Sequence, residues 1–155
     1  MKNKRIIAVV LLTATLLLLT ACKRGEEGFL NDIPEGVEQK VWFDELFIVA
    51  YPSQLADKGD IYFSRTFIYG DPSSADPVIF MVSEEISSLK VTSNITDEPY
   101  EIKKLEPNDA LLIAVELGDI PNVEIRFKDK SGHKHAYGIY KDAASGNAQY
   151  VLLEK

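Results

Sequence analysis

The stretch VEIRFKDKSGHKHAYGIY, residues 123–140, carries two strand-like runs that flank a glycine-containing turn. In residues 123–129, Val, Ile and Phe alternate with charged side chains, which predicts a strand with one buried face and one solvated face. The triplet Lys130-Ser131-Gly132 ends this run and predicts a hairpin turn. Residues 133–140 return to a strand-like composition. We therefore expect a β-hairpin in this part of the chain.

Similar short runs of aromatic and β-branched residues occur along the rest of the sequence, separated by Pro, Gly, Asn and Asp. They cover residues 41–51, 61–69, 78–82, 89–93, 100–105, 110–117 and 150–154. From residue 78 the runs begin about every ten to thirteen residues, a spacing typical of all-β sandwiches and barrels. We predict an all-β fold, an immunoglobulin-like β-sandwich of about 7–9 short antiparallel strands. The immunoglobulin-like part depends on strand number and spacing alone, because the Cys…Trp…Cys pattern is absent.

The beginning of this predicted domain, residues 37–51, allows two interpretations. Apolar residues between Val37 and Val49 have a spacing that would also mark one face of a helix. Residues 46–51 are mostly poor helix formers, which favours a strand over residues 41–51.

The N-terminal segment has a different character from the domain. Lys2, Lys4 and Arg5 precede an apolar run from Ile6 to Leu19, the arrangement of a secretory signal. The run is shorter than the roughly 20 apolar residues that a membrane-spanning helix needs. A transmembrane anchor remains the alternative when the next residues are counted with the run.

The end of this segment, Leu19-Thr20-Ala21-Cys22, resembles the bacterial lipobox. The resemblance covers residues 1–22 only. It implies that Cys22 receives a diacylglyceryl group and that the chain is cut before it. Residues 1–21 would then be a signal peptide that is removed, residues 22–36 a lipidated cysteine and flexible tether, and residues 37–155 a single β-rich extracytoplasmic domain.

This resemblance also implies a location and a membrane partner. The domain would sit on the outer face of a bacterial membrane, held by the acyl chains on Cys22. That membrane would be the cell membrane, or the outer membrane in an organism that has two.

Processing would change the charge of the protein. The full chain has a net charge of −7, and removal of Lys2, Lys4 and Arg5 leaves 14 basic and 24 acidic residues, a net charge of −10. This balance disfavours nucleic-acid binding, which needs clustered Lys and Arg. It provides solubility, or alternatively steers the protein toward a cationic partner. Acylation of Cys22 would use the only cysteine, so we expect no disulfide and no thiolate metal site. We also expect no cofactor, because the sequence contains no phosphate loop and no dinucleotide-binding fingerprint.

Four tyrosines are candidates for a partner-binding surface, because they lie on predicted strands whose two faces both carry apolar groups. Tyrosine offers a large contact area at low entropy cost. The alternative interpretation is a two-sided core. These residues are Tyr62, Tyr69, Tyr137 and Tyr140.

Two histidines are weak candidates for a metal site. His133 and His135 would share one face of a strand, because residues i and i+2 point the same way. Two ligands are too few for zinc, so Asp129 or Asp142 would have to supply a third. The alternative is two exposed polar side chains beside a turn.

One pair of motifs invites an enzymatic interpretation. Residues 87–90 match S-x-x-K, and residues 130–132 resemble the K-T-G element of penicillin-recognising enzymes. That chemistry needs the serine at a helix start, whereas residues 87–90 border a predicted strand, where positions three apart point to opposite faces. We therefore predict no catalytic residue.

Together these features predict a membrane-anchored, non-enzymatic module for protein binding or envelope assembly. The alternative is a module that binds a small ligand or inhibits a cationic envelope hydrolase.

Overall fold

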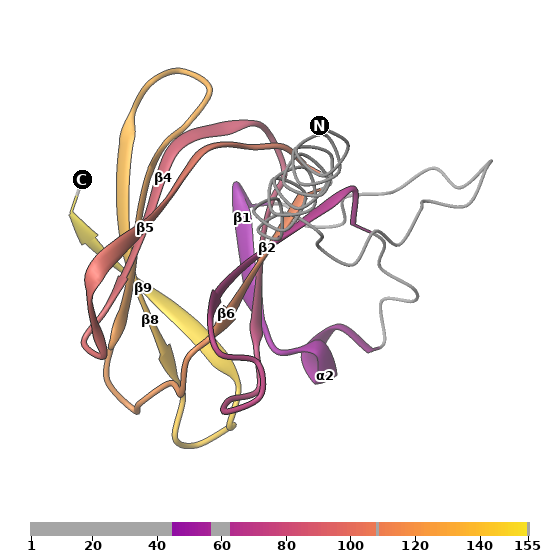
Figure 1. Cartoon of the computed structure of the whole chain (residues 1–155), viewed down its shortest axis with the longest axis vertical. Coiled ribbons are helices and arrows are strands. Elements are labelled where there is room, and N and C mark those ends of the chain that lie inside the picture. The colour runs from indigo at the N-terminus through magenta and orange to yellow at the C-terminus, as the bar shows by residue number, and fades with distance from the viewer. Residues whose placement is uncertain (1–44, 57–62, 108, 155) are drawn as a thin grey trace, which may run out of the picture.

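The computed structural model describes residues 45–56, 63–107 and 109–154. They form two β-sheets that face one another (Figure 1). The four-stranded sheet has the order β1-β3-β6-β2 and the five-stranded sheet the order β5-β4-β7-β8-β9. The elements are β1 (Phe47–Ala50), α2 (Pro52–Leu55), β2 (Arg65–Gly70), β3 (Val78–Val82), β4 (Ile86–Ser93), β5 (Thr96–Leu105), β6 (Asp109–Ala114), β7 (Val123–Lys128), β8 (Lys134–Lys141) and β9 (Ala148–Glu154).

The prediction of an all-β fold is confirmed over these residues, and β3 has the predicted bounds. The strand interpretation of residues 41–51 holds for Phe47–Ala50, which is followed by the four-residue helix α2. The signal peptide, the lipobox, the tether and Tyr62 lie outside the described residues.

One strand pair contradicts the expectation of purely antiparallel strands. β2 runs parallel to β6, with Arg65 opposite Asp109 and Gly70 opposite Ala114. Parallel neighbours need a long connection between them. Here that connection contains β3, β4 and β5, so the chain visits both sheets before β6 returns beside β2.

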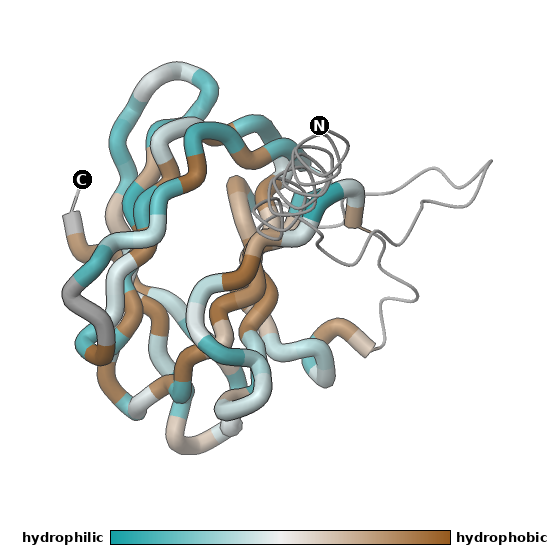
Figure 2. Tube along the Cα trace, in the orientation of Figure 1, coloured by the Kyte–Doolittle hydropathy of each residue, from teal (hydrophilic) through white to brown (hydrophobic). Residues whose placement is uncertain are grey.

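The hydrophobic core lies between the two sheets. The ring centroids of Phe80 and Phe127, from opposite sheets, lie 6.1 Å apart, and Phe47 is 5.4 Å from Phe80 and 5.8 Å from Phe127. All three side chains are almost fully buried. Burial of a side chain of this size contributes about 1.5–3 kcal/mol. Figure 2 shows that hydrophobic residues follow the strands, while the turns between them are mostly hydrophilic.

The predicted hairpin is formed by β7 and β8. Gly132 has a φ of 84°, and its N–H donates a hydrogen bond of 2.9 Å to the carbonyl oxygen of Asp129. This turn sets the register, in which Lys128 pairs with Lys134 and Phe127 with His135. Because side chains alternate along a strand, the lysine pair lies on the outer face of the sheet and Phe127 on the core face.

Strand β4 contains an irregularity in its pairing with β7. Its pairing with β7 shifts between Ser87 and Lys90, and the intervening Ser88 has a φ of 54°. Ile86 and Leu89 are three residues apart, yet both are fully buried. The irregularity explains this, because an extra residue restores Leu89 to the core face.

Candidate functional site

The outer face of the five-stranded sheet carries a row of basic residues. Lys128 on β7 pairs with Lys134 on β8 and with Ser87 on β4. In the neighbouring row, Arg126 pairs with Lys90 on β4 and with Ala136 on β8. The alternation that buries Ile125 and Phe127 is what directs Arg126 and Lys128 outward.

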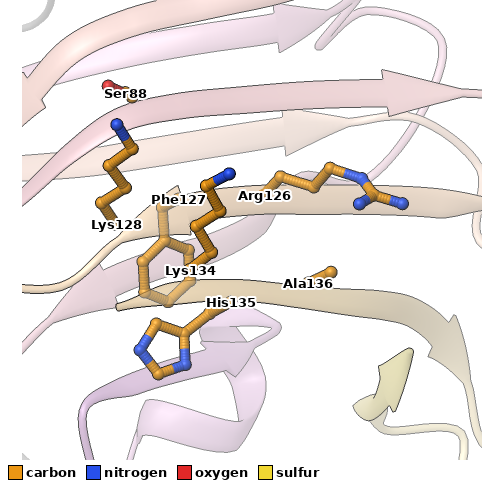
Figure 3. Close-up of a pocket in the computed structure, with 7 residues that line it drawn as sticks. All are labelled: Ser88, Arg126, Phe127, Lys128, Lys134, His135 and Ala136. Carbon is orange, nitrogen blue, oxygen red and sulfur yellow. The ribbon is translucent and has the colours of Figure 1, made fainter. Parts of the chain in front are cut away.

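A small pocket of about 240 Å³ opens on this face, between β4, β7 and β8. Its lining residues are Ser88, Arg126, Phe127, Lys128, Lys134, His135 and Ala136. In Figure 3 the Lys128 side chain points toward Ser88 and Lys134 extends over β7, while the rings of Phe127 and His135 lie on the other side of the strands. Among the residues that the structure describes, three cationic side chains and no carboxylate line the pocket.

The basic residues of this face differ in how their charge is balanced. Arg126 pairs with Glu124, and the Nζ of Lys90 lies 3.8 Å from Oε1 of Glu101. Within the described part of the chain, Lys128 and Lys134 have no ion pair. Like charges directly opposite each other on neighbouring strands destabilise a sheet. The pocket is therefore a place where an anion would be stabilised.

A second group of polar side chains lies at the hairpin turn, next to the pocket. Oδ2 of Asp129 is 2.9 Å from Nε2 of His135 and 3.3 Å from Nδ1 of His133. Its Oδ1 accepts a 2.9 Å hydrogen bond from the backbone N–H of His133. The contact with His135, followed by those with His133, lowers the pKa of Asp129 to about 2. The carboxylate thus fixes the turn that brings Lys128 opposite Lys134.

Both histidines therefore contact the carboxylate of Asp129, one of the two residues that the sequence suggested as a third metal ligand. His135 is partly buried and its ring stacks on Phe127 at 5.1 Å, whereas His133 is exposed. Asp142 lies elsewhere, in the β8–β9 turn, where it accepts hydrogen bonds from Ser145. No three His, Cys, Asp or Glu side chains within the described ranges are placed to hold a metal ion.

The candidate tyrosines do not form one surface. Tyr69 is 6% exposed and its hydroxyl donates a 2.9 Å hydrogen bond to Ser93, so it belongs to the core, which corrects its assignment to a recognition face. Tyr137 is half-buried, and the centroid of its ring lies 4.7 Å from that of Phe47. Burial raises the pKa of its hydroxyl. Tyr140 is also half-buried, three residues farther along β8, so the two side chains lie on opposite faces of the strand.

The S-x-x-K motif lies in β4 and not at a helix start, as expected. The prediction that Ser87 and Lys90 point to opposite faces is wrong, however. Both pair with outward residues of β7, because the irregularity at Ser88 adds one residue between them. The second motif, residues 130–132, is the predicted hairpin turn.

Sequence reasoning missed the site that the structure shows. The alternation of residues 123–129 already directed Lys128 outward, but its pairing with Lys134 depends on how the turn closes. Ser88 gave no local signal of its left-handed conformation.

No protein-family model, no curated protein and no solved structure matches this chain. Over the residues that the structure describes, no helix is both long and apolar enough to cross a membrane.

Proposed function

We propose that the mature protein is a lipid-anchored, non-enzymatic module on the outer face of a bacterial membrane. The resemblance of residues 19–22 to a lipobox supports the anchor at Cys22. Two facing sheets support a sandwich, and we extend this to an immunoglobulin-like arrangement on the number of strands, although the parallel β2–β6 pair departs from that pattern.

We further propose that this module binds an anionic partner through the outer face of its five-stranded sheet. One observation carries the proposal: Lys128 and Lys134 lie directly opposite each other in a pocket of the outer face, and among the described residues no carboxylate lines that pocket. A charge arrangement that weakens the sheet is explained when a partner supplies the missing negative charge.

The positive charge of this face argues against the alternative function, in which the module inhibits a cationic hydrolase. The acidic net charge favoured a cationic partner, but net charge describes the whole surface. The local charge at a pocket decides which partner is stabilised there. At the pocket that charge is positive.

Intact-mass analysis of protein extracted from membranes tests the anchor. The expected species begins at an acylated Cys22. An uncut chain that keeps residues 1–21 would overturn this part of the proposal.

Cross-linking in intact cells, followed by mass spectrometry, tests the binding face. Lys134→Glu reverses one charge in the pocket, and Lys141→Glu makes the same change at the other end of β8. We expect a reproducible partner with the wild type and with Lys141→Glu, and its loss with Lys134→Glu. Equal recovery with all three chains, or no reproducible partner at all, would contradict the proposal.

A further inference from the structure

The pocket between β4, β7 and β8 has features that narrow the chemistry of its ligand. Lys128 and Lys134 each carry an ammonium group with three N–H donors, and their Cβ atoms are neighbours across the strand pair. No carboxylate lines the pocket, so the two charges are compensated from outside the described chain or not at all. The site has two positive charges to offer.

The other cations of this face are less available to bind a ligand, because each is paired with a glutamate. Arg126 also lines the pocket, but its guanidinium pairs with Glu124 on the same strand. Lys90 is paired with Glu101. Glu124 and Glu101 are therefore each already paired with a cation of this face. The unmatched charge remains that of the two lysines.

Ser88 adds a hydroxyl group at the edge of the same pocket. Its φ of 54° lies in the left-handed region, and it is the only such non-glycine residue among those described. Strained conformations of this kind concentrate at ligand and active sites. The irregularity of β4 holds Ser88 where the Lys128 side chain points toward it (Figure 3). A hydroxyl donor thus lies on the Lys128 side of the pocket that both lysines line.

The size and charge of the pocket favour one class of anion. A volume of about 240 Å³ is smaller than the roughly 300–1,000 Å³ of pockets for drug-sized ligands, so the pocket suits a single small group. A carboxylate has one negative charge and would leave one lysine uncompensated. A phosphate monoester carries close to two negative charges and three strong acceptor oxygens at neutral pH. Lysine ammonium groups bind phosphate as point charges.

We infer that the pocket formed by Ser88, Lys128 and Lys134 binds a phosphate group with two negative charges. This inference rests on the proposed function, which gives the ligand a negative charge, and it adds that the charged group is a phosphate. The group has two sources, free inorganic phosphate or a phosphate ester on a larger molecule.

Isothermal titration of the full protein in detergent micelles tests this inference. The probes are inorganic phosphate, glycerol phosphate and, as a singly charged carboxylate, acetate. We expect both phosphate probes to bind at least about tenfold more tightly than acetate, because each lysine forms a charge-assisted contact with the dianion. Tighter binding of inorganic phosphate identifies the free ion, and tighter binding of glycerol phosphate identifies an ester.

Three variants and one matched control locate the binding. Lys128→Gln and Lys134→Gln should each weaken phosphate binding at least about tenfold, while Lys141→Gln, the same change at the far end of β8, should leave it within about twofold. Ser88→Gly removes the hydroxyl but keeps a residue that accepts a positive φ, and should weaken binding severalfold. Thermal melts should show that all four variants remain folded.

The outcomes separate this inference from the proposed function. Equal affinity for acetate and phosphate, or phosphate affinity unchanged by Lys128→Gln and Lys134→Gln, would overturn the phosphate assignment. If no phosphate probe binds while the cross-linked partner is still lost with Lys134→Glu, the phosphate assignment fails and the proposed function stands. If no phosphate probe binds and no cross-linked partner is lost with Lys134→Glu, both the phosphate assignment and the proposed function are refuted.

Discussion

The guanidinium group of Arg65 and the carboxylate of Asp109 form two hydrogen bonds across the parallel pair β2–β6, of 3.0 Å from Nε and 2.5 Å from Nη2. Asp109 is 1% exposed, whereas the Arg65 side chain is half exposed. The second carboxylate oxygen of Asp109 also accepts a 2.9 Å hydrogen bond from the backbone N–H of Glu106. This carboxylate therefore holds the start of β6 against the start of β2.

Asp109→Asn removes the charge of this buried group while keeping its shape. Because the two hydrogen bonds from Arg65 are charge-assisted, we expect the free energy of unfolding to fall by about 2–3 kcal/mol, measured by urea denaturation. Glu106→Gln is the control, since Glu106 is half exposed and 3.9 Å from Arg65, and should change stability by less than about 1 kcal/mol. An equal effect of the two substitutions would show that the Asp109 pair does not stabilise this strand contact.

Gly70 and Gly132 form a matched pair for testing backbone crowding. Both have positive φ, of 92° and 84°, so alanine is strained at each and should cost about 1–2 kcal/mol. At Gly70 a Cβ would also lie 2.1 Å from the carbonyl oxygen of Ala114 on the parallel neighbour β6, whereas at Gly132 nothing lies within 4 Å. We expect Gly70→Ala to lower the melting temperature clearly more than Gly132→Ala. Equal shifts would mean that β2 and β6 are not so closely packed at this end.

Asp129 makes stability depend on acidic pH. Its pKa is about 2 in the folded protein, below the ordinary value of 3.8, so the folded state binds fewer protons than the unfolded chain between these values. The stabilisation is therefore fully present above about pH 4 and is lost as the pH falls toward 2. We expect the melting temperature to drop more steeply over this window in the wild type than in Asp129→Asn. Parallel curves for the two chains would contradict the assigned role of this carboxylate.

The sequence predicted those parts of the fold that are determined locally. Alternation in residues 123–129 and the Lys130-Ser131-Gly132 turn were enough to predict the β7–β8 hairpin, and β3 was found from a short apolar run that follows Asp76-Pro77. The parallel pairing of β2 with β6 was not predictable in this way. It depends on the route of the chain through β3, β4 and β5, which no local pattern records.

The sequence placed single residues of the candidate site but did not predict how they come together. Lys128 was correctly directed outward, and Asp129 was named as a third group for the two histidines, but the pairing of Lys128 with Lys134 follows from the five-residue connection that Asp129 holds. Ser88 lies in an irregularity that arises because both Ile86 and Leu89 are needed in the core. The sequence left Tyr69 between a binding surface and a core, because it does not show that Ser93 satisfies the tyrosine hydroxyl inside the core.

The most direct test of the binding face is a map of backbone amide chemical shifts during titration of the full protein with inorganic phosphate. We predict that the shifts concentrate on Ser88, Lys128, Lys134 and their immediate neighbours in β4, β7 and β8. Lys134→Gln should suppress these shifts, while Lys141→Gln should not. Shifts centred on the other sheet, or shifts at the pocket that persist in Lys134→Gln, would contradict this prediction.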